Sequence, residues 1–405
     1  MSLRQPLAAG AWALWGSTLS PFALKLEALL RFADVPHRWL PAQGRFADAL
    51  RYALRRRRLV SGRLPLTWPR MTGLDEFPLV PILFGPGGEN LYDSSAIAAW
   101  LDANGHTGAS PLLPEGDAAL RFAVRLVDEA LDEVGLYLVH HNRWVVSARD
   151  NDAGARLALE MTPLLGPFAA LLRRAFPVRQ VRRLPYLFSV APPDAGFEDL
   201  PRRLRPPSRP GFPATHALLA EAFAGLLSAL EPLLASRPFL FGERFTLADA
   251  SVYGQLAMNR SDPSADRRIR SAAPAVHAWI GRLARGDFGD HRVLGALALD
   301  EVHAPLLAWI GAVFVPVMRQ NRDAWVWHRD RGETRFNEAA FDAGRALYEG
   351  TLLGRPFRAV SKTFQVRVWD ELLGTWESLD ARERARLAGW LGTDLDADCG
   401  AAGRR

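Results

Sequence analysis

Three small polar residues at the start of a helical pattern have the types needed to bind the amino-acid end of a ligand. Asp93, Ser94 and Ser95 come directly before a pattern that predicts a helix over Ser95 to Ala103. The free N–H groups and the positive dipole end of a helix start favour a carboxylate. The carboxylate of Asp93 suits an ammonium group. An α-amino acid end carries both groups on one carbon and fits this arrangement.

A proline lies in the strand-like run that precedes this helix. Pro81 interrupts the apolar stretch from Leu79 to Phe84. If the Val80–Pro81 bond is cis, the main chain of Val80 is turned outward, and its N–H and C=O can pair with an extended peptide. Together, the two features predict a site for a small peptide with an amino-acid head.

The elements that must position this site form a compact α/β pattern near the N-terminus. Short apolar runs predict strands at Ala11–Trp15 and His37–Leu40. Ser20 and Pro21 suit the N-cap and first position of the helix between them. The stretch around Pro81 adds a hairpin, and a further helix is expected between Pro41 and Glu76. The order β-α-β-(α)-β-β-α indicates one domain of about 100 residues.

After Pro111 the patterns become helical. A proline-rich connector is expected at Ala191–Pro213, and Thr246 and Asp249 have capping-box spacing. The expected helices are Asp117–Val146, Thr162–Arg174, Thr215–Leu234, Thr246–Asn259, Ala298–Gln320, Phe336–Tyr348 and, with interruptions, Ala359–Trp390. The chain therefore reads as an α/β domain followed by an all-helical region with a helical C-terminal extension.

Composition excludes several classes of protein. The single cysteine, Cys399, excludes a disulfide framework and a cysteine zinc site and favours a cytoplasmic setting. The histidines lack metal-ligand spacing, so no metal is expected. Only Lys25 and Lys362 are lysines, and a net charge of +6 gives no reason to expect nucleic-acid binding. The apolar run from Ala304 to Val317 is too short to predict a membrane span.

Four motifs in register resemble the glutathione transferase family. They are LWGSTLSPFALKLEALL, VPILF, LYDSSAIAAWL and GERFTLADASVYG, and the serine before Pro-Phe is similar to that of the tau-type enzymes. The resemblance implies a thioredoxin-like glutathione-binding domain at residues 8–105, an all-helical domain at 106–290 and a helical extension at 291–405. The extension is a departure, since ordinary members end near its start.

The resemblance also implies roles for individual residues. Ser20 matches the serine that assists the thiol, with Ser17 as its rival because the turn after the first strand aligns in more than one way. Val80 and Pro81 match the main-chain contact to the cysteinyl amide of glutathione. Asp93 and Ser94 match the pair that holds its γ-glutamyl end. Each of Ser20, Asp93 and Ser94 has a structural alternative as a helix cap.

The resemblance also implies an acceptor pocket for the electrophile. The residues expected to line it are Phe22, after Ser20 and Pro21, and Tyr137, His141 and Trp144 on the first long helix of the second region, with His140 beside them. The alternative is a packed helix with amphipathic aromatic side chains. Arg55–Arg58 reads as a solvated helix face; family members commonly use a basic residue in this region for the glycyl carboxylate of glutathione.

The resulting hypothesis is an enzyme that takes glutathione as co-substrate and activates its thiol for attack on a small apolar electrophile. The alternative is a non-catalytic protein of the same fold, used for protein interaction or ligand carriage. The resemblance implies a homodimer unless the extension covers the usual contact surface. The sequence leaves the electrophile unidentified.

Overall fold

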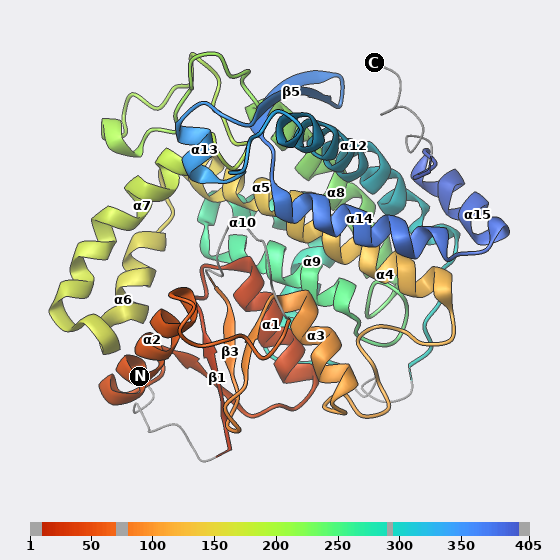
Figure 1. Ribbon diagram of the computed structural model, residues 1–405, viewed down its shortest axis with the longest axis horizontal. Helices are drawn as coiled ribbons and strands as arrows, with labels where there is room; N and C mark the ends of the chain where they lie inside the picture. The colour runs from red at the N-terminus through yellow and green to blue at the C-terminus, as the bar shows by residue number, and fades with distance from the viewer. Residues whose placement is uncertain (1–9, 70–79, 290–294, 397–405) are drawn as a thin grey trace.

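A four-stranded mixed sheet forms the centre of the N-terminal domain. The computed structural model describes residues 10–69, 80–289 and 295–396 (Figure 1). The strand order is β2-β1-β3-β4, with β1 and β2 parallel and the other neighbours antiparallel. The strands are β1 (Trp12–Trp15), β2 (His37–Leu40), β3 (Ile82–Phe84) and β4 (Asn90–Tyr92). Leu79, the expected first residue of the third strand, lies outside the described residues.

Three helices cover this sheet, two on one face and one on the other. They are α1 (Pro21–Phe32), α2 (Phe46–Val60) and α3 (Ser94–Ala103). The side chains of Trp12 and Leu14 join the core formed with α1 and α3, whereas Ala13 and Trp15 pack in a second cluster with Tyr52 of α2. This alternation follows from the two-residue period of a strand. The expected α/β domain is confirmed.

Helices make up most of the next region. Its long first helix runs from Ala118 to Val146 and includes two π-helical segments. The elements are α4 (Ala118–Ala130), η1 (Leu131–Gly135), α5 (Leu136–His141), η2 (Asn142–Val146), α6 (Ala153–Leu165), η3 (Gly166–Leu171), α7 (Leu172–Arg183), η4 (Arg202–Leu204), α8 (His216–Ser236), α9 (Leu247–Met258), η5 (Asn259–Ser261), α10 (Pro263–Ala272) and α11 (Pro274–Ala284).

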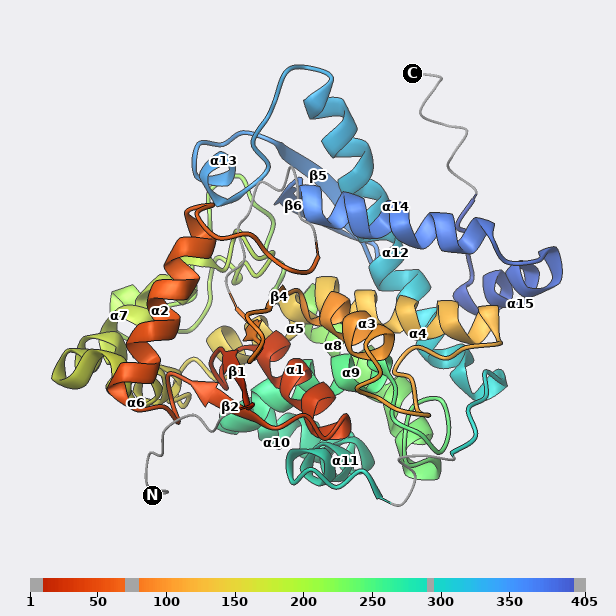
Figure 2. The same cartoon turned by 60° about the horizontal axis from the view of Figure 1, so that its bottom comes forward.

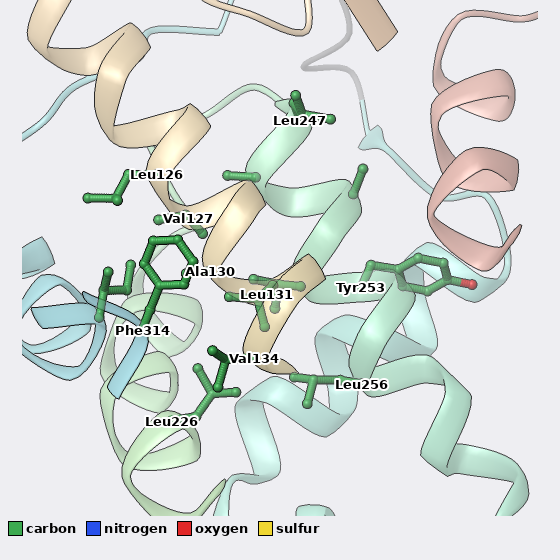
Figure 3. Packing of buried hydrophobic residues seen from close by; sticks show 14 of the residues in the cluster. Leu126, Val127, Ala130, Leu131, Val134, Leu226, Leu247, Tyr253, Leu256 and Phe314 are labelled. Carbon is green, nitrogen blue, oxygen red and sulfur yellow. The ribbon is translucent and has the colours of Figure 1, made fainter. Parts of the chain in front are cut away.

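The two regions pack closely where α1 meets α9. Gly254 of α9 lies against α1, and a Cβ at that position would sit 2.5 Å from the carbonyl oxygen of Pro21. Only glycine therefore permits this approach. The expected capping box of Thr246 and Asp249 is present at the start of α9. Figure 3 shows apolar side chains of α4 and η1 between α9, α8 and Phe314 of the extension.

The extension packs onto the helical region and shares its core. It comprises η7 (Glu301–His303), α12 (Ala304–Arg329), α13 (Glu338–Asp342), β5 (Leu347–Leu352), β6 (Arg355–Val360), α14 (Thr363–Glu377) and α15 (Ala381–Leu391). Helix α14 runs beside α4 in Figures 1 and 2. The extension is not all helical, because β5 and β6 form an antiparallel hairpin. The helix expected over Phe336–Tyr348 is only the short α13.

The helix expected over Thr162–Arg174 is also different in the structure. Two helices, α6 and α7, pack against each other as a hairpin, and η3 joins them at Gly166, where φ is 54°. This hairpin projects from one side of the molecule near α2 (Figures 1 and 2). Within the described residues, three segments are long and apolar enough to cross a membrane: Ala153–Arg183, His216–Ser236 and Glu301–Arg329.

Candidate functional site

One cavity of about 1000 Å³ lies between the N-terminal domain, the helical region and the extension. The turn after β1, the segment before β3 and the start of α3 form one side of it. The long helix α4–η2, the α6–α7 hairpin and α14 form the other side. Nine of the ten residues expected from the sequence to act on glutathione or its acceptor line this cavity: Ser17, Ser20, Phe22, Val80, Pro81, Asp93, Ser94, Tyr137 and Trp144.

The two segments expected from the sequence to form a peptide site have the predicted main-chain geometry. The Val80–Pro81 bond is cis, and both residues line the cavity. Asp93 has φ 70°, a conformation that few residues other than glycine, Asn and Asp adopt. In this conformation its carboxylate caps α3 by accepting a hydrogen bond from the N–H of Ala96 at 2.9 Å. Asp93 therefore both caps α3 and lines the cavity.

Ser20 is both the N-cap of α1 and a cavity residue. Its hydroxyl oxygen accepts a hydrogen bond from the N–H of Ala23 at 3.3 Å, which leaves the hydroxyl proton available for donation. The hydroxyl of Ser17 accepts from the N–H of Leu19 at 3.1 Å. The main-chain N–H of Ser20 bonds to the carbonyl of Ser17 at 2.9 Å, so the two serines share one tight turn.

A buried arginine ties this turn to the helical region. The guanidinium of Arg143 donates to the carbonyl of Leu19 at 2.9 Å and to both carboxylate oxygens of Asp262 at 2.9 and 3.0 Å. It also donates to the carbonyl of Met258 at 2.7 Å. Because Leu19 precedes Ser20, Arg143 fixes the position of Ser20 relative to the acceptor side of the cavity.

A second buried cation holds α3 against the helical region. The ammonium of Lys25, which is 1% exposed, lies 2.5 Å from Asp128 and 2.6 Å from Asp132. It also donates to the hydroxyl of Ser95 at 2.7 Å. Burial alone lowers the pKa of Lys25, but the two carboxylates together raise it above its ordinary value. The first turn of α3, next to Asp93 and Ser94, is therefore anchored through a charged cluster.

Three carboxyl groups from the long helix face the cavity at one end. Burial raises the pKa of Glu129 above its ordinary range, and it raises the pKa values of Asp132 and Glu133 to about 7. Glu129 pairs with Arg125 at 3.0 Å. This end of the cavity, beside Asp93, is therefore lined by carboxyl groups that retain their protons to a higher pH than usual.

The extension supplies polar groups to the same end of the cavity. The hydroxyl of Tyr137 accepts hydrogen bonds from the ammonium of Lys362 at 2.6 Å and from the amide of Gln365 at 2.7 Å. Gln365 also bonds to Glu133. Residues more than 220 positions away in the sequence thereby form one wall of the cavity with the long helix.

The opposite end of the cavity is mainly aromatic and apolar. Trp144 lies there with Leu157 and Phe176, and Met161 of the α6–α7 hairpin also lines the cavity. Tyr137 lines the cavity as expected, with its hydroxyl at the polar end. His141 does not line it. Its ring is buried and lies 2.8 Å from the ring of His216 on α8 (Nε2 to Nδ1).

His140 lines the cavity in place of its neighbour. The cavity-facing stripe of the long helix is centred on Glu133 and His140, which leaves His141 on the flank that faces α8. Burial lowers the pKa of His140 to about 3, so its ring is neutral at physiological pH. It therefore contributes an uncharged, polar edge to the aromatic end.

The arginine run on α2 divides into three roles. Arg55 donates to Asn90 at 2.7 Å and to the carbonyl of Glu89 at 2.9 Å, so it stabilises the β3–β4 turn. Arg56 lines the cavity, and its Nε has no hydrogen-bond partner among the described residues. Arg57 and Arg58 are exposed. Only Arg56 of the four is placed to meet a ligand.

Sequence reasoning missed the charged residues of this site. Arg125, Glu129, Asp132 and Glu133 recur at helical spacing on an otherwise apolar helix, and that pattern was the available signal. Lys362 was visible only as one of two lysines in an arginine-rich chain. Among the described residues, no group of three His, Cys, Asp or Glu side chains is arranged to hold a metal ion.

The raised pKa of Glu133 predicts that Glu133→Gln stabilises the protein more at pH 8 than at pH 5. Because the native carboxyl has a pKa near 7 rather than 4.5, the native state binds more protons than the unfolded chain between these values. The wild type therefore loses this contribution to its stability as pH rises through that window. We expect the difference in unfolding free energy between variant and wild type to grow by about 1–3 kcal/mol, measured by urea unfolding.

The matched control is Glu371→Gln, the same chemical change at a half-exposed position on α14 that also lines the cavity. At this more exposed position the substitution should change the unfolding free energy by no more than about 0.5 kcal/mol. A difference for Glu133→Gln that is independent of pH would show that this carboxyl is ionised throughout.

The comparisons with known proteins agree with this architecture. Residues 19–104 match the model of the glutathione S-transferase N-terminal domain, and residues 209–282 match that of the C-terminal domain. No curated protein is significantly similar to the chain.

The chain is also similar to several solved structures. A glutathione S-transferase of Ceriporiopsis subvermispora in complex with glutathione is 15% identical, with a TM-score of 0.42, covering 68% of this chain and 98% of its own. The tau-class enzyme MiGSTU of mango, Mangifera indica, is 15% identical, with a TM-score of 0.36 and shares of 71% and 94%. The beta-etherase LigF of Sphingobium sp. strain SYK-6 is 14% identical, with a TM-score of 0.38 and shares of 67% and 94%.

The two domain matches leave residues 105–208 and the chain beyond residue 282 unmatched. The matched segments include Ser20, Val80, Pro81, Asp93 and Ser94, and they occur in the order of the thioredoxin-like domain and the helical domain described above. The chain therefore contains an N-terminal and a C-terminal domain of the glutathione S-transferase family.

Proposed function

We propose that the protein activates the thiol of glutathione for attack on a small apolar electrophile. The observation that carries this proposal is that Ser20, the cis Val80–Pro81 segment and the start of α3 at Asp93 and Ser94 all line one cavity. Its volume of about 1000 Å³ lies at the upper end of small-molecule sites, which leaves room for a tripeptide and a second substrate.

Glutathione, γ-Glu-Cys-Gly, would lie along the N-terminal domain. Its γ-glutamyl carboxylate would meet the N–H groups at the start of α3, and its ammonium would meet the carboxylate of Asp93. The cysteinyl amide would pair with the main chain of Val80. Arg56, whose Nε has no partner among the described residues, suits the glycyl carboxylate.

The chemical step requires a thiolate. A free thiol has a pKa of about 8.5, so only a few per cent is ionised at pH 7. The hydroxyl of Ser20 would donate a hydrogen bond to the sulfur at the N-terminus of α1, and both groups favour the anion. The sulfur then forms a bond to the electrophilic carbon. With an aromatic halide as acceptor, the halide leaves with the electron pair of its bond, and the thiol proton passes to solvent.

The acceptor would occupy the aromatic end of the cavity. Trp144, Leu157, Met161 and Phe176 supply apolar contacts there, and His140 supplies a neutral polar edge. These side chains favour a flat, uncharged electrophile over a charged one.

Calorimetric titration with glutathione tests the binding half of the proposal. We expect saturable binding in the micromolar to millimolar range. Arg56→Ala should weaken it about 10-fold, because one charge-assisted contact is lost. Arg57→Ala removes the neighbouring charge from an exposed position and should leave the affinity unchanged.

Absence of any binding by the wild type would overturn the proposal and favour a non-catalytic protein of this fold. The cytoplasmic location and the homodimer expected from the sequence remain predictions.

A further inference from the structure

Large apolar side chains are exposed almost entirely in one part of the described structure. Nine of the eleven belong to α2 with the segment after it and to α6–η3. The nine are Phe46, Leu50, Leu54, Val60, Trp68, Leu159, Leu165, Phe168 and Leu171. Phe168 and Leu171, in the turn that joins α6 to α7, are 74% and 69% exposed. Exposed apolar side chains that gather in this way mark a contact surface.

The same hairpin carries unbalanced positive charge. Between Glu160 and Asp194 the sequence has five arginines and no acidic residue. Arg173, Arg174 and Arg179 on α7 are exposed, and none of them pairs with an acidic residue of the described chain. We define the basic tip as Leu159, Leu165, Phe168, Leu171, Arg173, Arg174 and Arg179.

The adjoining helix α2 extends this surface. Leu164 of α6 packs against the cluster that contains Tyr52 and Leu59 of α2, so the two helices are neighbours. Phe46, Leu50 and Leu54 recur every four residues and form one exposed stripe on α2. Exposed arginines at 51, 57 and 58 accompany the stripe.

The α6–α7 hairpin is as apolar as a membrane-spanning helix, but its two helices are too short to cross a bilayer. In its most apolar stretch, within Ala153–Arg183, only 11% of the residues are buried. Helices α6 and α7 contain 13 and 12 residues and fold back on each other at Gly166. A helix that crosses a bilayer needs about 20 residues, so neither helix is long enough. The tip can insert only shallowly.

We propose that the basic tip docks on the surface of an anionic lipid bilayer. Phe168 and Leu171 would enter the headgroup boundary, and the arginines beside them would contact acidic lipids. A second copy of the chain is disfavoured, because it would bring arginine against arginine. Nucleic acid is disfavoured, because its phosphates give Phe168 and Leu171 no apolar partner.

Docking in this way would bring the cavity near the membrane. Leu157, Met161 and Phe176 of the same hairpin line the aromatic end of the cavity. Glu160 of α6 accepts a hydrogen bond from the N–H of Thr18, in the turn that contains Ser17 and Ser20. A bound tip therefore holds the acceptor side of the cavity close to a phase in which apolar compounds concentrate.

Vesicle flotation of the full chain tests the proposal. We expect binding to phosphatidylserine/phosphatidylcholine vesicles, little binding to pure phosphatidylcholine, and weakening by 0.5 M NaCl. The variant R173A/R174A should reduce the partition coefficient about 30-fold, since each arginine near an anionic surface contributes about a factor of 5. F168D/L171D should reduce it at least as strongly.

Two control variants match these changes elsewhere on the chain. R382A/R386A removes two positive charges from exposed positions on α15, and V302D/W327D introduces two negative charges at exposed apolar positions on η7 and α12. Both should bind vesicles as the wild type does. None of the substituted tip residues lines the cavity, so glutathione titration and circular dichroism verify that the tip variants are folded.

Equal binding to neutral and anionic vesicles, or equal loss in the tip and control variants, would overturn the proposal. So would binding to no vesicle. A nucleic-acid fragment that is retained by the protein and competes with vesicles would assign the tip to that partner instead.

Discussion

Replacing Ser20 by glycine should lower kcat/KM for conjugation of glutathione to an aromatic halide about 10- to 100-fold near pH 7. A hydrogen bond to a charged group contributes about 1.5–3 kcal/mol, which is the stabilisation that the thiolate would lose. Glycine is chosen because it caps a helix almost as well as serine, whereas alanine costs about 1 kcal/mol of stability. The pH–rate profile should shift to higher pH, because the bound thiol becomes a weaker acid.

Ser17→Ala is the control for this experiment. Ser17 shares the turn and the cavity with Ser20, but its hydroxyl accepts from the N–H of Leu19 rather than capping α1. Its removal should leave the pH–rate profile in place. The reverse outcome, a shift with Ser17→Ala and none with Ser20→Gly, would transfer the thiol-assisting role to Ser17.

Replacing Lys25 by methionine should destabilise the protein by about 3–5 kcal/mol, because it leaves Asp128 and Asp132 buried without their cation. The three side chains are almost completely buried, so water cannot compensate for the loss. Ser95 also loses its contact with the ammonium, and the start of α3 is released from the helical region. We expect a lower midpoint of urea unfolding and, in the fraction that remains folded, weaker binding of glutathione.

Arg322→Ala provides the comparison. Arg322 and Asp370 lie 2.7 Å apart in a half-exposed ion pair between α12 and α14, and such pairs contribute at most about 1 kcal/mol. Combining Lys25→Met with Asp132→Asn should recover part of the lost stability, because one uncompensated charge is removed. Lys25→Met with the stability of the wild type would mean that the cluster does not need its ammonium.

Sequence patterns within one helical turn were sufficient to predict how the helices around the site begin. Ser20 followed by Pro21 is a helix start on residue type alone, and the structure has the cap there. Thr246 and Asp249 form their capping box because its spacing is fixed within one turn. Interactions that span three or four residues can be recognised in a sequence, and the helix starts at Ser20 and Asp93 are built from them.

The hairpin in the extension shows where local rules gave the wrong element. Its turn places Leu353 at φ 49° and Gly354 at φ 70°. Two-residue turns of this kind favour Asn-Gly or Asp-Gly, because leucine rarely adopts a positive φ. The sequence therefore lacks the usual turn signal, and the helix expected over Phe336–Tyr348 includes the first two residues of β5. The hairpin is stabilised by packing of β5 against α12, a contact that the turn sequence does not predict.

Contacts between distant segments were out of reach for a different reason. Helical periodicity shows that Glu133, Tyr137 and His140 share a face, but it does not say what lies opposite that face. The segment that lies opposite is the start of α14. Its N-cap residue, Lys362, donates a hydrogen bond to the hydroxyl of Tyr137, which is 225 positions earlier in the sequence. The matched family domains end at residue 282, so resemblance did not supply this contact either.

Because the chain has only two lysines, Lys362 is a nearly unique reactive group in this wall of the cavity. Lys25 is buried in the core. Lys362, between β6 and α14, is the other lysine of the chain. The main chain of Lys362 is held on both sides by Asn321, at 2.8 Å through its N–H and 3.1 Å through its carbonyl. Cleavage after Lys362 by a lysine-specific protease therefore requires these two hydrogen bonds to break, so its rate measures local unfolding at the start of α14.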